Sequence, residues 1–97
     1  MTDSLTLDAA LPSTPAAAAG LLEPLLRQAA GAGSEPVSLT LDYGRPGLPG
    51  EAVTVEAALE RATRTLAFVH GRVLAGEEVL AAAQAVFRRP VQAPGAD

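Results

Sequence analysis

The chain has 97 residues, 48% hydrophobic and only 3% aromatic, with a net charge of −4 at pH 7. This length makes one domain, and such a domain buries roughly 60–65% of its unfolded surface. The core must be built from Leu, Val and Ala and is therefore thin, so we expect the chain to bury more surface as a homodimer or tetramer. The acidic balance excludes nucleic acid as a partner, since no basic stripe can release counterions from phosphates.

The absence of some residue types and segments narrows the function further. The chain has no cysteine, which excludes disulfides, thiolate zinc sites and a Cys nucleophile. His70 is the single histidine and has no Cys or His partner, so we expect no metal site. No stretch reaches the length of a membrane span, and the N-terminus lacks the regions of a signal peptide. The sequence therefore predicts a soluble, cytoplasmic protein that does not bind membranes.

One apolar helix is predicted at about residues 15–31. Its leucines recur at the i, i+3, i+4 spacing that makes one apolar face. Thr14 is the predicted N-cap, and Pro15 suits the first helical position because it has no N–H to leave unpaired. Pro24 falls in the interior, where it removes one hydrogen bond at a cost of about 3 kcal/mol. We expect a kink there; the alternative is a break near Gly20.

Alternating apolar and polar residues predict five strands. A short one covers residues 4–8, and the others lie near 37–43, 52–61, 63–74 and 78–88. The last two are apolar on both faces, as expected of a central strand or one at a subunit interface. Residues 78–88 are rich in alanine, but their short length and the turn before them favour a strand. We expect one domain over residues 1–88 and a mobile tail over 89–97, which contain two prolines and a glycine.

This order of elements is an α+β plan, with the helix packed on one face of the sheet. Five landmarks accompany it: Asp42-Tyr43 closing a strand with Arg45-Pro46 after it, Pro49-Gly50-Glu51, a strand from Arg61 to Arg72, the turn Ala75-Gly76-Glu77, and the strand 79–87. In these features, over a little more than half its length, the chain resembles the C-terminal portion of hotdog-fold acyl-CoA thioesterases. The resemblance implies a hotdog-like antiparallel sheet wrapped around one central helix. Cystatin-like folds have a similar order of elements, so topology alone does not separate the two.

The resemblance also implies where catalytic groups lie. In those thioesterases the thioester carbonyl sits at the N-terminus of the central helix, where backbone N–H groups polarise it, and a carboxylate follows about two turns later. The corresponding groups here are the amides of Ala16 and Ala17 and the carboxylate of Glu23, which lies eight positions after Pro15, or about 12 Å along the axis. The family's His-Gly-Gly signature and its upstream strands are absent. Glu23 also fits a solvated residue on the polar side of the helix.

Three arginines are candidates for the cofactor end of the substrate. Arg61, Arg64 and Arg72 stand on or near the strand 63–74, where related enzymes often contact the phosphates of coenzyme A. A guanidinium fork matches phosphate geometry. The alternative is that these arginines pair with acidic residues of neighbouring strands, namely Glu56, Glu60 or Glu77. Arg45 stands beside a proline in a loop and carries no more specific signal.

We therefore expect an acyl-CoA thioesterase-like protein that hydrolyses or binds an acyl thioester. No separate cofactor is expected, because coenzyme A enters only as part of the substrate. The alternative is a catalytically inactive hotdog subunit that serves binding or assembly, which the missing His-Gly-Gly favours. A third reading is a cystatin-like binding domain.

Overall fold

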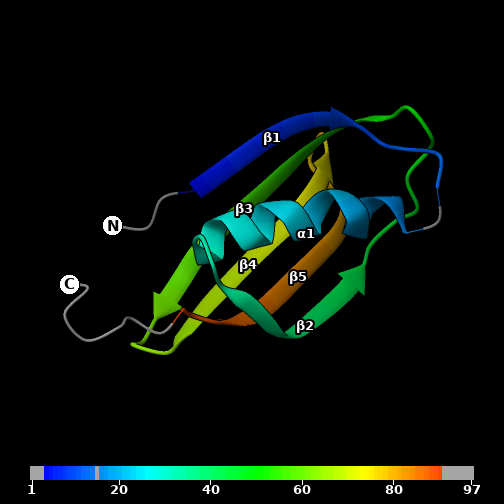
Figure 1. Ribbon diagram of the computed structural model, residues 1–97. Helices are drawn as coiled ribbons and strands as arrows, with labels where there is room; N and C mark the ends of the chain where they lie inside the picture. Colours follow the sequence, from blue (N-terminus) through cyan, green and yellow to red (C-terminus); the bar gives the residue numbers. More distant parts are fainter. Residues whose placement is uncertain (1–3, 15, 91–97) are drawn as a thin grey trace.

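A computed structural model describes residues 4–14 and 16–90 of the chain. Its elements, drawn in Figure 1, are β1 (Ser4–Ala10), α1 (Ala17–Ala30), β2 (Glu35–Tyr43), β3 (Ala52–Ala62), β4 (Leu66–Ala75) and β5 (Glu78–Arg88). The α+β class and the five strands are confirmed, and residues 78–88 form a strand despite their alanines. With 14 residues, α1 falls short of the length that crosses a membrane, and it is the only helix in the part of the chain described.

The strands form one antiparallel sheet in the order β1-β3-β4-β5-β2, and α1 lies across one of its faces (Figure 1). The two strands that are apolar on both faces, β4 and β5, are interior strands, which explains their pattern. The edge strands are β1 and β2. Each has one strand partner among the described residues, so its other side presents unpaired backbone groups.

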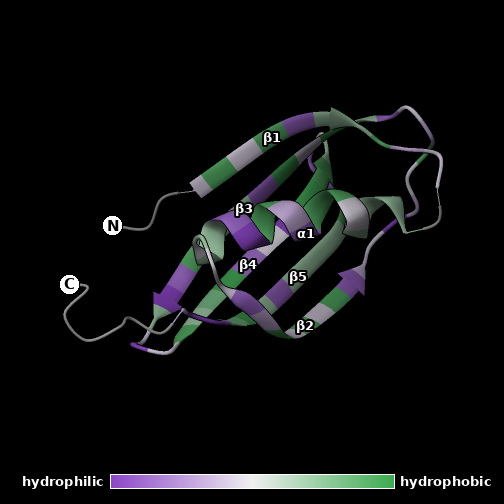
Figure 2. Cartoon of the chain, in the orientation of Figure 1, coloured by the Kyte–Doolittle hydropathy of each residue, from purple (hydrophilic) through white to green (hydrophobic). Residues whose placement is uncertain are grey.

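The core lies between α1 and the sheet. Helix residues Leu22 and Leu26 are each 1% exposed and face small and branched side chains of the three central strands. Figure 2 shows the hydrophilic and hydrophobic residues alternating along β1 and β2, as strand geometry requires. The inner row of β5 is Ala81, Ala83, Ala85 and Phe87, all buried. Small inner residues let the helix approach the sheet closely, so the core is tight although it has few aromatics.

The start of α1 differs from the prediction. The helix begins at Ala17, and its N-cap is Ala16 in the left-handed conformation, with no side-chain cap. Thr14 as the N-cap is therefore wrong. Pro15, expected at the first helical position, lies outside the described residues.

Pro24 stands inside α1 without ending it. The helix runs unbroken from Ala17 to Ala30 (Figure 1), so the alternative of a break near Gly20 is wrong. The buried leucines Leu22, Leu25 and Leu26 stand on both sides of Pro24. Their packing on the sheet compensates for the hydrogen bond that proline removes.

The turn between β3 and β4 shifts one predicted boundary. The strand expected from residue 63 begins at Leu66, because Thr63 closes a tight turn. Its N–H donates to the Leu66 carbonyl at 2.7 Å and its Oγ1 accepts the Leu66 N–H at 3.0 Å. Arg64 lies in this turn. Arg89, the first residue of the expected tail, donates its N–H to the Thr65 carbonyl at 2.8 Å; residues 91–97 lie outside the described part of the chain.

Candidate functional site

A cavity of about 500 Å³ lies at the N-terminus of α1. We call it the helix-end cavity. Its walls are the segment before the helix, the first helical turn, the end of β2 with the loop after it, and one side chain of β5. The lining residues are Leu11, Pro12, Ser13, Thr14, Ala16, Ala17, Ala18, Tyr43, Gly44, Arg45, Pro46, Gly47, Pro49 and Leu80.

Backbone amides in this wall have no hydrogen-bond partner among the described residues. Among the described residues, the first hydrogen bond of the helix is from the Gly20 N–H to the Ala16 carbonyl, at 3.0 Å. Within the described residues, no hydrogen bond uses the N–H of Ala16 or Ala17. Ala16 has φ 58° and ψ 32°, a conformation that costs an alanine roughly 1–2 kcal/mol. A left-handed residue directly before a helix turns successive N–H groups to one side, which creates a concave anion site at the positive helix end.

Arg45 fixes the loop that forms the opposite wall. Its Nη2 donates to Glu51 Oε2 at 2.6 Å, its Nε to Glu78 Oε1 at 2.9 Å, and its Nη1 to the Pro46 carbonyl at 2.9 Å. The hydrogen bonds that Arg45 donates to Glu51 and then to Glu78 raise the pKa of Arg45 above its ordinary value. The bond from Arg45, followed by one from the Leu48 N–H, lowers the pKa of Glu51. Glu51 is therefore a weak base, held for structure.

Gly47 allows this loop to close over the cavity. A Cβ at this position would collide with the Leu11 side chain and would lie 3.0 Å from Leu80 Cδ1. The loop is also joined to the segment before the helix, because the Gly50 N–H donates to the Leu11 carbonyl at 2.7 Å. The cavity thus has an apolar wall from Leu11 and Leu80 and a polar wall from the two amides.

Glu23 lies on the exposed side of α1. Its Oε2 accepts a hydrogen bond from Arg27 Nη2 at 3.2 Å, and its side chain is 52% exposed. It stands six residues after Ala17, or about 9 Å along the axis, and does not line the helix-end cavity. Within one chain, the structure brings Ala16 and Ala17 together in the cavity wall but leaves Glu23 outside it.

The three candidate arginines do not form one group. Arg61 is the last but one residue of β3, with its Cζ 4.4 Å from the centroid of the Phe68 ring, and Arg64 lies in the next turn. Arg72 stands on β4 with its Nε 2.8 Å from Glu56 Oε1, so the pairing alternative holds for this arginine. The helix-end cavity lies near the Ala52 end of β3, and nine residues of strand put Arg61 about 30 Å from that end.

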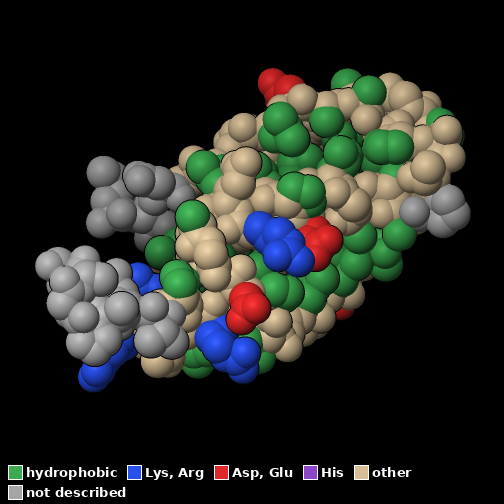
Figure 3. All heavy atoms as spheres, viewed as in Figure 1, with side chains coloured by type: hydrophobic (Ala, Val, Ile, Leu, Met, Phe, Trp, Pro, Cys, Tyr) green, Lys and Arg blue, Asp and Glu red, His purple; other side chains and the backbone are tan. Residues whose placement is uncertain are grey.

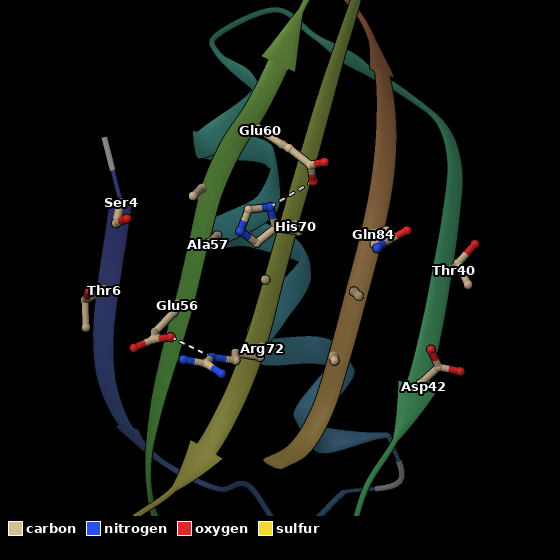
Figure 4. Close-up of a pocket in the computed structure, with 14 residues that line it drawn as sticks. Ser4, Thr6, Thr40, Asp42, Glu56, Ala57, Glu60, His70, Arg72 and Gln84 are labelled. Atoms are coloured by element: carbon tan, nitrogen blue, oxygen red, sulfur yellow. Dashed lines mark hydrogen bonds and ion pairs between the residues drawn. The ribbon is translucent and has the colours of Figure 1, made fainter. Parts of the chain in front are cut away.

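A second hollow, of about 680 Å³, lies on the face of the sheet opposite α1. Figure 4 shows two pairs of side chains in it: Glu60 Oε1 lies 3.2 Å from His70 Nδ1, and Arg72 Nε donates to Glu56 Oε1 at 2.8 Å. Its floor is made of alanines and Gly71. Although it is the larger of the two, its arginine, Arg72, is already paired with Glu56, and it contains no helix end. We therefore assign the candidate active site to the helix-end cavity.

Sequence reasoning missed the role of two wall residues. Tyr43 and Arg45 line the helix-end cavity, yet the sequence marked Arg45 only as a loop residue. The sequence did contain a weak signal for Arg45. Glu51 follows Arg45 by six residues across a segment of glycines and prolines, and an arginine and a glutamate at that spacing can pair to close a loop.

Comparison with known proteins identifies the family. Residues 13–88 match the family described as the acyl-CoA thioesterase N-terminal domain. No curated protein matches the chain.

Solved structures agree on the fold. A putative thioesterase, a phenylacetic acid degradation-related protein from Ralstonia eutropha, is 22% identical with a TM-score of 0.73, over 89% of this chain and 76% of that one. A mutant of phenylacetic acid degradation protein PaaI from Thermus thermophilus has 15% identity and a TM-score of 0.79. The match covers 90% of this chain and 85% of that one. Zebra fish thioesterase superfamily member 2 is 17% identical in sequence with a TM-score of 0.79. The match covers 88% of this chain and 73% of that one. These matches confirm the hotdog fold over the cystatin-like alternative, and the chain belongs to the acyl-CoA thioesterase N-terminal domain family.

Proposed function

We propose that this chain hydrolyses acyl-CoA thioesters at the helix-end cavity. The observation that carries the proposal is the pair of unused amides, Ala16 and Ala17, in the wall of a cavity at the positive end of α1. Membership in a thioesterase family makes an acyl-CoA the expected ligand.

The chemistry follows from the two walls. The thioester carbonyl oxygen accepts hydrogen bonds from the Ala16 and Ala17 amides, which strengthen as negative charge develops on the oxygen. One such preorganised donor contributes about 10²–10³-fold to kcat in other acyl-transfer enzymes. The acyl chain lies against Leu11 and Leu80. Water then attacks the carbonyl carbon and the thiol of coenzyme A leaves.

Glu23 is our proposed carboxylate, either as the base that activates the water or as the attacking nucleophile. Its position on α1, beyond the first turn and on the same helix as the two amides, supports this role. Its exposure and its bond to Arg27 mean that something must cover this side of the helix before Glu23 acts. A second copy of the chain can provide that cover.

The edge strand β2 supports a homodimer. Its inner-face residues Leu39 and Tyr43 are 50% and 61% exposed, because α1 packs mainly on β3 and β4 and only lightly on β2. Figure 3 shows the face that carries α1, where apolar side chains surround few charged ones. Apolar side chains beside unpaired strand backbone favour pairing with another strand. We propose that two copies pair antiparallel along β2; a tetramer would need a second contact.

Such a dimer also bears on the candidate arginines. In an antiparallel pair, the start of the partner's β2 would lie beside Tyr43, at the end of β2 in the first chain. Within each chain, the start of β2 lies next to Arg88 of β5. The arginine end of the second copy would then adjoin the helix-end cavity of the first. Arg61 and Arg64, and less directly the paired Arg72, are our candidates for holding the phosphates of coenzyme A across the dimer.

The test is turnover of a panel of acyl-CoA esters by the purified protein and its Glu23→Gln variant. We expect hydrolysis by the wild type and a loss of about 10²–10⁴-fold in the variant, the usual contribution of a positioned acid–base group. Unchanged turnover in Glu23→Gln would remove Glu23 from the mechanism. A wild-type protein inactive on every ester would instead be a binding or assembly subunit. The proposed cytoplasmic location is tested separately, by fractionation of the native cells.

A further inference from the structure

Pro24 lies inside α1, and the proposed hydrolysis gives it no role. A proline has no N–H, so the carbonyl four residues earlier, that of Gly20, loses its usual helical donor. No side chain of the described residues takes the place of that donor, because the side-chain bonds to carbonyls end on Ala30, Pro46, Leu66 and Thr63. The Gly20 carbonyl oxygen is therefore an acceptor without its usual partner.

The surroundings of this carbonyl are open to solvent. Gly20 and Pro24 are both exposed, since the buried leucines of α1 turn the opposite side of the helix to the sheet (Figure 1). A Cβ built on Gly20 would meet no side chain within 4 Å. Carbonyls on the solvent side of a helix also tilt outward, toward water. A water molecule can therefore reach the Gly20 oxygen without displacing a side chain.

Gly20 lies between the groups that the proposed hydrolysis already uses. It stands three residues after Ala17, or about 4.5 Å along the axis, and Glu23 follows after the same interval. Ala16, Gly20 and Glu23 are all exposed and recur at i, i+4 and i+7, so they lie along one stripe of the helix. The Gly20 carbonyl thus reduces the axial gap that separates Glu23 from the helix-end cavity.

Glu23 offers a second acceptor beside this carbonyl. Residues three apart on a helix are neighbours, and a long side chain points back toward the preceding turn, here the turn of Gly20. One carboxylate oxygen, Oε2, accepts the bond from Arg27 Nη2 at 3.2 Å, while Oε1 has no described partner. A water molecule between Glu23 Oε1 and the Gly20 oxygen would donate one hydrogen to each, and its lone pairs would point away from both.

We propose that the Gly20 carbonyl, freed by Pro24, holds the attacking water together with Glu23, which makes Glu23 the general base and not the nucleophile. The inference rests on the proposed hydrolysis and names the partner of Glu23 in it. Gly20 contacts the reacting water, whereas Pro24 is a positioning residue that acts through Gly20. A carboxylate alone leaves the water free to rotate. The second acceptor fixes its orientation, and orientation of a reactant lowers the barrier.

The attack of this water uses groups on one helix. The water oxygen forms a bond to the thioester carbon as one proton passes to Glu23 Oε1, while the second hydrogen stays bonded to the Gly20 carbonyl. The electron pair of the thioester carbonyl moves to its oxygen, which the Ala16 and Ala17 amides hold. When this pair returns, the C–S bond breaks and the thiolate of coenzyme A takes the proton from Glu23. The products are a carboxylic acid and a thiol, and Glu23 is ionised again.

Pro24→Ala tests the role of the freed carbonyl in the full chain. Alanine supplies an N–H that bonds the Gly20 carbonyl, so we expect kcat for acyl-CoA esters to fall about ten-fold with KM unchanged, as loss of one hydrogen bond to the water predicts. The same variant should unfold at a higher temperature, because proline is the least favourable residue in a helix interior. A merely structural role of Pro24 would not combine lower activity with higher stability.

The matched control carries lactic acid, the hydroxy-acid counterpart of alanine, at position 24. This group has the alanine side chain but an ester oxygen in place of the N–H, so the Gly20 carbonyl stays free. We expect it to restore the kcat that Pro24→Ala loses. Thermal unfolding of both variants shows that each is folded.

The outcomes separate this inference from the proposed function. A wild-type kcat in Pro24→Ala, or an equal loss in the lactic acid variant, would overturn the role of the Gly20 carbonyl. If Glu23→Gln still loses turnover in that case, the proposed function stands without it. A wild-type protein that hydrolyses no acyl-CoA ester overturns both, since there is then no attack by water for the carbonyl to serve.

Discussion

Arg45 Nη2 and Glu51 Oε2 lie 2.6 Å apart and join the two ends of the loop that walls the helix-end cavity. A second bond runs from Arg45 Nε to Glu78 at the start of β5, so the same guanidinium also ties the loop to β5. The shape of the cavity mouth therefore depends on a polar contact as well as on apolar packing.

The contribution of this ion pair to stability should depend on pH. The pKa of Glu51 is lowered in the folded chain from the ordinary value of 4.5, chiefly by the bond from Arg45. A carboxyl group whose pKa is lower in the folded chain than in the unfolded chain stabilises the fold at pH values above its unfolded-state pKa. This stabilisation is lost as the pH falls through the folded-state pKa. We expect Glu51→Gln to unfold at a lower temperature than wild type at pH 7, and this difference to shrink below pH 4.5.

Thermal unfolding of both proteins between pH 3 and 8 measures this difference. The control is Glu77→Gln, because Glu77 makes no ion pair with any described residue. Its unfolding temperature should follow that of the wild type at every pH. A gap between wild type and Glu51→Gln that stays constant down to pH 3 would show that the lost interaction is not ionic.

Gly71 lies in β4 beneath the helix leucines Leu22 and Leu26. A Cβ there would lie 2.6 Å from the Glu56 carbonyl oxygen and 2.9 Å from Leu22 Cδ1. Because the first contact is backbone, neither side can move away easily, and we expect Gly71→Ala to destabilise the fold by about 1–3 kcal/mol. Unfolding in urea measures this loss.

Gly20 is the matched control for Gly71. It lies inside α1, and a Cβ at this position would meet no other atom within 4 Å. Gly20→Ala should therefore raise stability by about 0.5–1 kcal/mol, the usual gain when alanine replaces glycine in a helix. Equal and small effects of the two substitutions would mean that the helix does not rest on Gly71.

The proposed dimer makes a prediction about β2. Leu39 faces the helix side of the edge strand, whereas its neighbour Thr40 faces the opposite side. We expect Leu39→Glu to produce a monomer, because charge on an apolar edge opposes strand pairing. Light scattering after gel filtration, over a wide range of concentrations, measures the mass. Thr40→Glu should keep the dimer; a wild-type monomer at every concentration would end the proposal.

The sequence predicted the sheet well because its signal is periodic. Buried Val53, Val55 and Ala57 alternate with polar residues along β3, and no other reading of that pattern places all three inside. The helix start was missed for a different reason: Ala16 in a left-handed conformation has no sequence signal, since alanine rarely adopts it. Capping preferences therefore favoured Thr14.

The grouping of charged residues was also beyond the sequence. Arg61 and Arg88 are 27 positions apart and become neighbours of one strand only through the register of β4. Arg72 looked equivalent to Arg61, yet a strand neighbour, Glu56, neutralises it. Which arginine is paired depends on side chains meeting across strands, and spacing along one chain does not encode that.

The left-handed conformation of Ala16 gives the last prediction. Ala16→Gly removes the steric cost of φ 58° and should stabilise the fold by about 1 kcal/mol. Ala17→Gly, one residue later, lies in the right-handed helix and should destabilise it by about 0.5–1 kcal/mol. Both variants keep the backbone N–H groups, so opposite shifts in unfolding temperature would reflect backbone conformation alone. If both glycines destabilise equally, Ala16 is right-handed in solution, and the concave arrangement of amides on which the helix-end cavity depends is absent.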